Sequence, residues 1–155
     1  MFGKKFEEYL HFGQWILILV PLVFAARLGL SLAGVPNSQT RWVSINIVLL
    51  LGLVYYSIAV HTSGFGTYKH LFVVLLFQNS VAHTLIALAI VLGIVTGHDN
   101  IFTAPEFSGG ADGKTWFHAL LHLIAAPLAA AVAWLLGSLI LFVTRKLRPQ
   151  SREEL

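Results

Sequence analysis

Residues 117–143 read FHALLHLIAAPLAAAVAWLLGSLILFV, a run that contains no Asp, Glu, Lys or Arg. A helix of more than about 18 apolar residues is long enough to cross the roughly 30 Å of hydrocarbon in a bilayer. We therefore expect residues 117–143 to form a membrane-spanning helix.

Three further apolar runs precede this one, and the four together account for most of the 155 residues. The earlier runs lie at about 12–34, 42–62 and 70–97. Hydrophobic residues make up 57% of the chain and charged residues only 11%, which is far from the average for soluble proteins. The sequence therefore predicts an all-α fold, an integral membrane four-helix bundle that forms a single membrane domain over residues 1–155.

The basic residues lie mainly on one side of these spans, and this distribution indicates the topology. On one side are Lys4, Lys5, Lys69, Arg145, Lys146, Arg148 and Arg152. The other side carries only Arg41 and Lys114. Because cytoplasmic loops of membrane proteins are enriched in Lys and Arg, we expect an inner (plasma) membrane protein with both termini cytoplasmic, N-in/C-in. The formal charge of +3 is then explained by orientation, without nucleic acid as a partner.

The segments outside the spans are short. Residues 1–12 mix Lys and Glu with aromatic side chains, which predicts a short amphipathic N-terminal segment in the headgroup region. A cleaved signal peptide is the alternative for the N-terminus, but the first apolar run is too long for a typical one. Residues 98–116 form the extracytoplasmic connector, and residues 144–155 form a basic cytoplasmic tail.

Several chemistries are excluded by composition. The chain has no cysteine, so disulfides, thiolate metal sites and iron–sulfur clusters are ruled out. Its acidic residues all lie outside the apolar runs, so the sequence indicates no catalytic residues within the bilayer and no enzyme activity of the chain on its own. The stretch GGADGKT at 109–115 approaches the phosphate-loop pattern, but Ser108 stands where that pattern needs glycine.

Small residues predict which helices pack together, because membrane helices associate through close backbone approach. The third span contains a GxxxG pair, Gly93 and Gly97. The fourth span carries a row of small residues at every fourth position: Ala125, Ala129, Ala133 and Gly137. We expect these two spans to pack together, although an oligomer could use the same small residues.

Three histidines within the spans stand out, because an ionisable group at this depth costs about 2.5 to 3.5 kcal/mol on insertion scales. His83 is near the middle of the third span, and His118 and His122 share one face of the fourth. Two imidazoles from facing helices are the usual axial ligands of haem b, and three nitrogen ligands suit a non-haem metal ion. The plain alternative is hydrogen bonding between helices. We take His83, His122 and His118 as candidate cofactor ligands, with haem b as one candidate cofactor.

Other polar side chains in the spans extend this group. They are Arg27, Asn46, His61, Gln78 and Asn79. Together with the histidines they could line a polar pathway for protons or small ions. Arg27 lies near the outer end of its span, so it could instead extend its side chain to the lipid headgroups.

These features support three functional hypotheses. The first is a cofactor-binding or accessory subunit of a larger membrane complex. The second is an oligomeric channel or transporter, since four helices are too few to enclose a pore and a homo-oligomer would be needed. The third is a purely structural assembly protein. In all three the lipid bilayer is the surrounding partner.

Overall fold

The computed structural model describes residues 1–106, 108 and 112–149. All regular secondary structure in these ranges is α-helix. The helices are α1 (Phe6–Leu32), α2 (Asn37–Thr40), α3 (Ile45–Thr62), α4 (Tyr68–Thr96) and α5 (Trp116–Leu147). Four helical segments are long and apolar enough to cross a membrane: α1, α4, α5 and the segment Asn37–Thr62, which contains α2 and α3. The prediction of an all-α membrane bundle is confirmed at this level.

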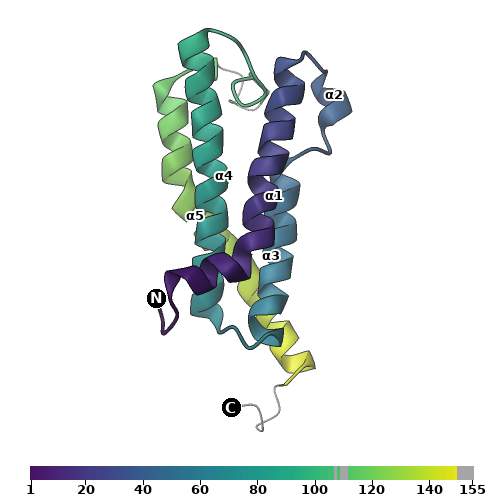
Figure 1. Cartoon of the computed structure of the whole chain (residues 1–155), viewed down its shortest axis with the longest axis vertical. Coiled ribbons are helices and arrows are strands. Elements are labelled where there is room, and N and C mark those ends of the chain that lie inside the picture. Colours follow the sequence, from purple (N-terminus) through teal and green to yellow (C-terminus); the bar gives the residue numbers. More distant parts are fainter. Residues whose placement is uncertain (107, 109–111, 150–155) are drawn as a thin grey trace.

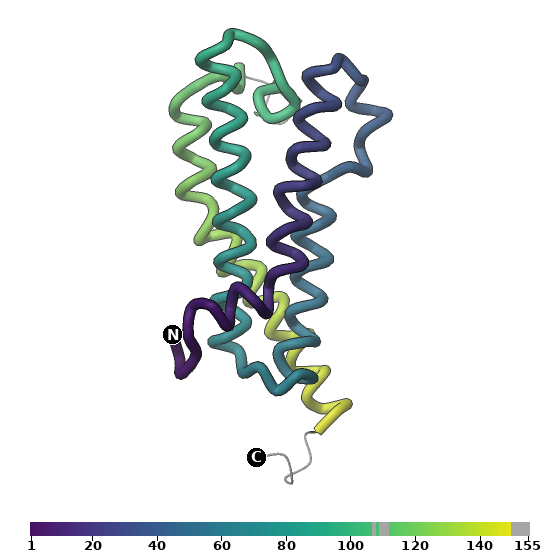
Figure 2. The backbone as a smooth tube through the Cα atoms, in the orientation of Figure 1, coloured from purple at the N-terminus to yellow at the C-terminus, as the bar shows by residue number. Residues whose placement is uncertain are grey.

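The four long helices form a bundle in which α1 contacts α3 and α4, and α5 contacts the same two helices from the other side. α5 changes neighbours along its length. Beside the upper half of α4 it lies away from α3, and in the lower half it crosses behind α4 to reach α3 (Figures 1 and 2). Pro127 lies inside this helix, where the missing backbone N–H permits a bend.

Local sequence explains several helix ends. Thr115 caps α5, because its side chain accepts a hydrogen bond of 3.1 Å from the backbone N–H of His118. Gly97 ends α4 with a φ of 73°, a left-handed conformation that favours glycine. α1 begins at Phe6, so the helix runs without a break from the N-terminal segment into the first apolar run.

The lower half of the bundle holds its largest buried cluster. The members include Tyr9, Tyr56, Val60, Leu71, Leu75 and Leu141, contributed by all four long helices. Two hydrogen bonds tie the helices together there: Tyr56 Oη donates to the Gly13 carbonyl over 3.0 Å, and Trp134 Nε1 donates to the Tyr68 carbonyl over 2.8 Å. Large apolar side chains on the outer surface, such as Trp15 and Leu135, remain exposed, as a lipid-facing surface requires.

The two spans that carry the small residues pack together, as predicted, but Gly93 and Gly97 are not the residues in that contact. α4 and α5 make the most extensive helix contact, but Gly93 lies against the connector, where an added Cβ would come within 2.9 Å of Thr103 Cγ2. Gly97 serves to end α4. On α5 the buried alanines are Ala126 and Ala130. The predicted Ala125, Ala129 and Ala133 are only half-buried, whereas Gly137 is buried against Ser57 of α3.

Two features of the sequence analysis lie partly outside the described residues. They are the glycine-rich stretch, at residues 109–111, and the tail, at residues 150–155.

Candidate functional site

His83 and His122 lie in direct contact in the upper half of the bundle. Their Nδ1 atoms are 3.1 Å apart, and the ring centroids are separated by 5.3 Å. A hydrogen bond at this distance needs one donor and one acceptor, so at least one of the two rings is neutral at its Nδ1. The structure thus brings the two histidines, which lie on separate spans, within hydrogen-bond distance of each other.

His118 extends this pair toward the connector. Its ring centroid lies 5.1 Å from that of His122, and its Nδ1 lies 2.9 Å from the carbonyl oxygen of Gly113. A carbonyl oxygen can only accept, so Nδ1 of His118 carries the proton in this contact. The three imidazoles form a chain that runs from the connector down to the middle of α4.

The arrangement of these rings does not fit haem b. A metal ion held between two imidazole nitrogens needs them about 4 Å apart, given metal–nitrogen bonds of about 2.0 to 2.1 Å. Haem also needs room for its macrocycle between the rings, whereas His83 and His122 touch. Among the described residues, no group of three or more His, Asp or Glu side chains is placed to hold a metal ion.

Arg27 is turned into the protein. This residue is only 7% exposed. It donates hydrogen bonds to Asn37 Oδ1 and Thr40 Oγ1 at the two ends of α2, which explains why this short helix folds back over α1. Both acceptors are neutral. The ion pairs within the described ranges are Lys4 with Glu8 and Lys114 with Asp99, so Arg27 has no carboxylate partner there.

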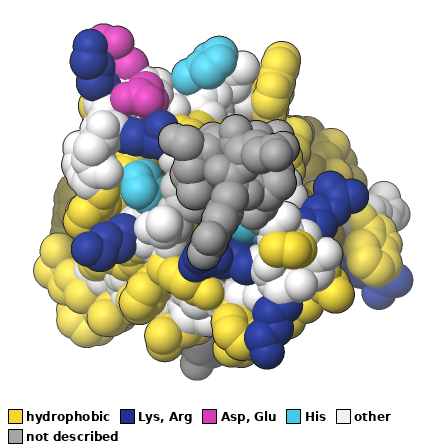
Figure 3. All heavy atoms as spheres, turned by 90° about the horizontal axis from the view of Figure 1, so that it is seen from below, with side chains coloured by type: hydrophobic (Ala, Val, Ile, Leu, Met, Phe, Trp, Pro, Cys, Tyr) yellow, Lys and Arg dark blue, Asp and Glu magenta, His cyan; other side chains and the backbone are white. Residues whose placement is uncertain are grey.

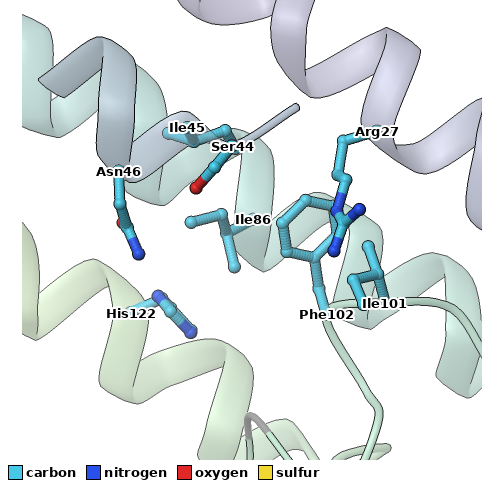
Figure 4. A pocket seen from close by; sticks show the side chains of 8 residues that line it. All are labelled: Arg27, Ser44, Ile45, Asn46, Ile86, Ile101, Phe102 and His122. Carbon is cyan, nitrogen blue, oxygen red and sulfur yellow. The ribbon is translucent and has the colours of Figure 1, made fainter. Parts of the chain in front are cut away.

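A partly enclosed pocket of about 250 Å³ lies between these groups. Its lining residues come from α1, α3, α4, α5 and the connector: Arg27, Ser44, Ile45, Asn46, Ile86, Ile101, Phe102 and His122. Figure 4 shows Asn46 and His122 on one side of the space and Arg27 on the other, with Ile86 between them. Three polar residues predicted from separate spans therefore converge on one cavity, and its remaining walls are largely apolar.

The connector forms one wall of this pocket, which the sequence analysis did not anticipate. Asn100 Nδ2 donates to the Ala89 carbonyl of α4 over 2.8 Å, and Asn100 also bonds within its own turn to Phe102 and Thr103. This turn directs Phe102 inward, where its ring stacks on Phe24 of α1 at 5.3 Å. The signal in the sequence is the adjacent apolar pair Ile101 and Phe102 near the start of the connector.

An ion pair also holds the connector. Lys114 Nζ lies 2.8 Å from Asp99 Oδ1. The hydrogen bond to this carboxylate raises the pKa of Lys114 above its usual range. The pair links the two ends of the connector outside the membrane-spanning helices.

The remaining polar residues of the predicted pathway lie apart from the pocket lining. Gln78 Nε2 donates to the Leu49 carbonyl over 3.0 Å, and Asn79 Nδ2 donates to the Leu75 carbonyl over 2.8 Å. His61 Nε2 lies 2.7 Å from the Arg148 carbonyl at the end of α5. These contacts satisfy backbone carbonyls or join helices, as interhelical hydrogen bonds in membrane proteins do.

Comparison of the chain with protein-family models, with curated proteins and with solved structures found no match.

Proposed function

We propose that this chain is a small multi-pass membrane protein that binds an amphiphilic molecule in the pocket between Arg27, Asn46 and His122. It would act as a binding protein or as the accessory subunit of a larger membrane complex. The observation that carries the proposal is the convergence of polar groups from α1, α3 and α5 on one cavity with apolar walls. Binding sites for small molecules combine apolar walls with a few polar groups in this way.

The size of the pocket limits what it can hold. The pocket has a volume of about 250 Å³ and is open on one side. This space suits a polar head and the first few carbons of an apolar chain. The rest of a longer apolar ligand chain would leave through the open side of the pocket, where membrane lipid would solvate it.

The proposed orientation places the pocket in the outer half of the inner membrane, with both termini in the cytoplasm. The N-terminus, the α3–α4 loop and the end of α5 all lie at the lower end of the bundle (Figure 1). Lys and Arg side chains lie around the rim of this end (Figure 3). The enrichment of basic residues in cytoplasmic segments supports the assignment. Because the chain has no cysteine, Ser38→Cys and Ser63→Cys give single thiols for labelling from outside, and only Ser38→Cys should react.

The binding proposal is tested by extracting the molecules that copurify with the protein in mild detergent and identifying them by mass spectrometry. The Ile86→Trp variant fills the pocket, and Leu88→Trp, on the exposed side of the same helix, is the matched control. We expect that about one molecule of ligand per protein copurifies with wild type and with Leu88→Trp, and that this ligand is absent from Ile86→Trp. Identical extracts from all three proteins would refute binding in this pocket.

Proton transfer is a second candidate function, favoured by the contact between His83 and His122. His118, His122 and His83 are three titratable side chains in sequence from the connector inward, and His118 Nδ1 lies against the Gly113 carbonyl. Proton flux into liposomes, measured with a pH-sensitive dye, should then fall in His83→Gln. Flux equal to that of protein-free liposomes in the wild type would exclude this function.

A further inference from the structure

Arg27 is the charged group of the pocket, and its environment bears on what the pocket binds. Among the residues that the structure describes, no carboxylate lines the pocket between Arg27 and His122. Asp99 and Glu106 line a neighbouring cavity that Arg27 also borders, but neither forms an ion pair with it, and Asp99 is paired with Lys114. The positive charge of Arg27 is therefore buried without a counter-ion among the described residues.

The hydrogen-bonding capacity of Arg27 is only partly used. A guanidinium carries five N–H donors. The bonds to Asn37 and Thr40 engage one N–H on each terminal nitrogen. Three donors are left without an acceptor among the described residues. These donors belong to a side chain that lines both cavities.

We propose that Arg27 anchors an oxyanion, so that the ligand is an anionic amphiphile with a phosphate or carboxylate head on an apolar chain. This inference rests on the proposed function. A buried cation needs an opposite charge or ligand to offset the loss of its hydration, and guanidinium bonds oxyanions through two N–H groups at once. Ile45, Ile86 and Phe102 would contact the first carbons of the chain, and Asn46 and His122 would bond a neutral oxygen of the same molecule.

Two sources could supply such a ligand, an anionic lipid of the bilayer and a free anion from the outer aqueous side. Both present the same chemistry to Arg27. They differ in the need for an apolar chain, so phosphatidylglycerol and inorganic phosphate are the two competing probes that separate them.

The test measures binding of radiolabelled dodecyl phosphate to the full chain in nanodiscs of phosphatidylcholine. The competitor is either unlabelled dodecyl phosphate or its neutral dimethyl ester. Hydrogen bonds to a charged group predict a preference for the acid of about ten- to a hundredfold in wild type. Arg27→Gln should reduce this preference to about one, whereas Arg27→Lys keeps the charge but loses the paired N–H groups and should keep only part of the preference. Arg41→Gln is the matched control, since Arg41 is exposed and stacks on Trp42.

The outcomes separate the two proposals. In wild type, the acid and the ester could compete equally well, and Ile86→Trp could abolish binding of both. This result would overturn the anion anchor while leaving the pocket as a binding site. Binding that Ile86→Trp leaves unchanged would overturn the proposed function itself. The wild-type comparison needs no substitution, so it holds even if Arg27→Gln fails to fold. Competition by phosphatidylglycerol supports the inference and identifies a lipid source. Competition by inorganic phosphate alone would keep an oxyanion site at Arg27 but overturn the need for an apolar chain, and competition by neither overturns the inference.

Discussion

Gly52 is the position where a single added methyl group should disturb the bundle most clearly. It lies on α3 at the junction with α1 and α4. A Cβ at this residue would lie 1.9 Å from Gln78 Oε1, 2.8 Å from Gln78 Cδ and 3.0 Å from Ile16 Cγ2. Gln78 is only 1% exposed, so its amide has little free space into which it could move.

The cost of Gly52→Ala can be worked out from these contacts. Overpacking a well-packed core costs about 1 to 3 kcal/mol. Displacing Gln78 also breaks its bond to the Leu49 carbonyl, and such bonds contribute about 0.6 kcal/mol on average in membrane proteins. Alanine gains up to about 1 kcal/mol in helix propensity over glycine. The net expectation is a free energy of unfolding lowered by about 1 to 3 kcal/mol.

Unfolding by sodium dodecyl sulfate in mixed micelles, followed by circular dichroism, measures this difference. Gly29→Ala is the control, because a Cβ there meets nothing within 4 Å and the variant should be as stable as wild type or slightly more so. Gln78→Ala should relieve the clash, so the double variant should lose less than the sum of the single ones. A Gly52→Ala protein as stable as Gly29→Ala would refute the packing described at this junction.

Three further predictions concern the upper half. Thr40→Val removes an acceptor of Arg27 and should lower the free energy of unfolding by about 1.5 to 3 kcal/mol, while Ser38→Val, at an exposed position of the same short helix, should change it little. The raised pKa of Lys114 means that its ion pair is fully present below lysine's ordinary value of about 10.4 and is lost as pH rises through the folded-state value. Hydrogen exchange in residues 98–106 should therefore rise over that pH range in wild type and be less pH-dependent in Lys114→Met. A reduced-minus-oxidised spectrum of the purified protein should lack a haem b band, and a band lost in His83→Ala would contradict the geometry of the histidine pair.

Composition and periodicity were sufficient to predict the helical membrane architecture. Apolar runs without charged residues have few other stable solutions in a bilayer, because every backbone group must be bonded within its own segment. Which residues of each helix contact a neighbouring segment was harder to predict. Gly93 and Gly97 match a packing motif, yet one packs on the connector and the other ends α4. A pair of glycines indicates where another segment can approach the helix backbone closely, but it does not indicate which segment that is.

The candidate site was predicted in part. His83 and His122 were identified as polar groups inside the spans, and the structure places them in contact. Their spacing along two helices could not distinguish a hydrogen bond from a site for a macrocycle, since the difference is about 1 Å in the distance between two ring nitrogens. Phe102 was missed because a loop of this length has no periodicity, and its position depends on the turn formed by Asn100.

The central claim is that the pocket between Arg27 and His122 holds a ligand, and a thiol placed in its wall tests this most directly. Asn46→Cys would be the single cysteine of the chain, and Ser38→Cys, outside the pocket lining, is its control. We predict that dodecyl phosphate slows modification of Asn46→Cys by a small thiol reagent at least fivefold and leaves Ser38→Cys unchanged. Equal modification rates of Asn46→Cys with and without the amphiphile would contradict the account.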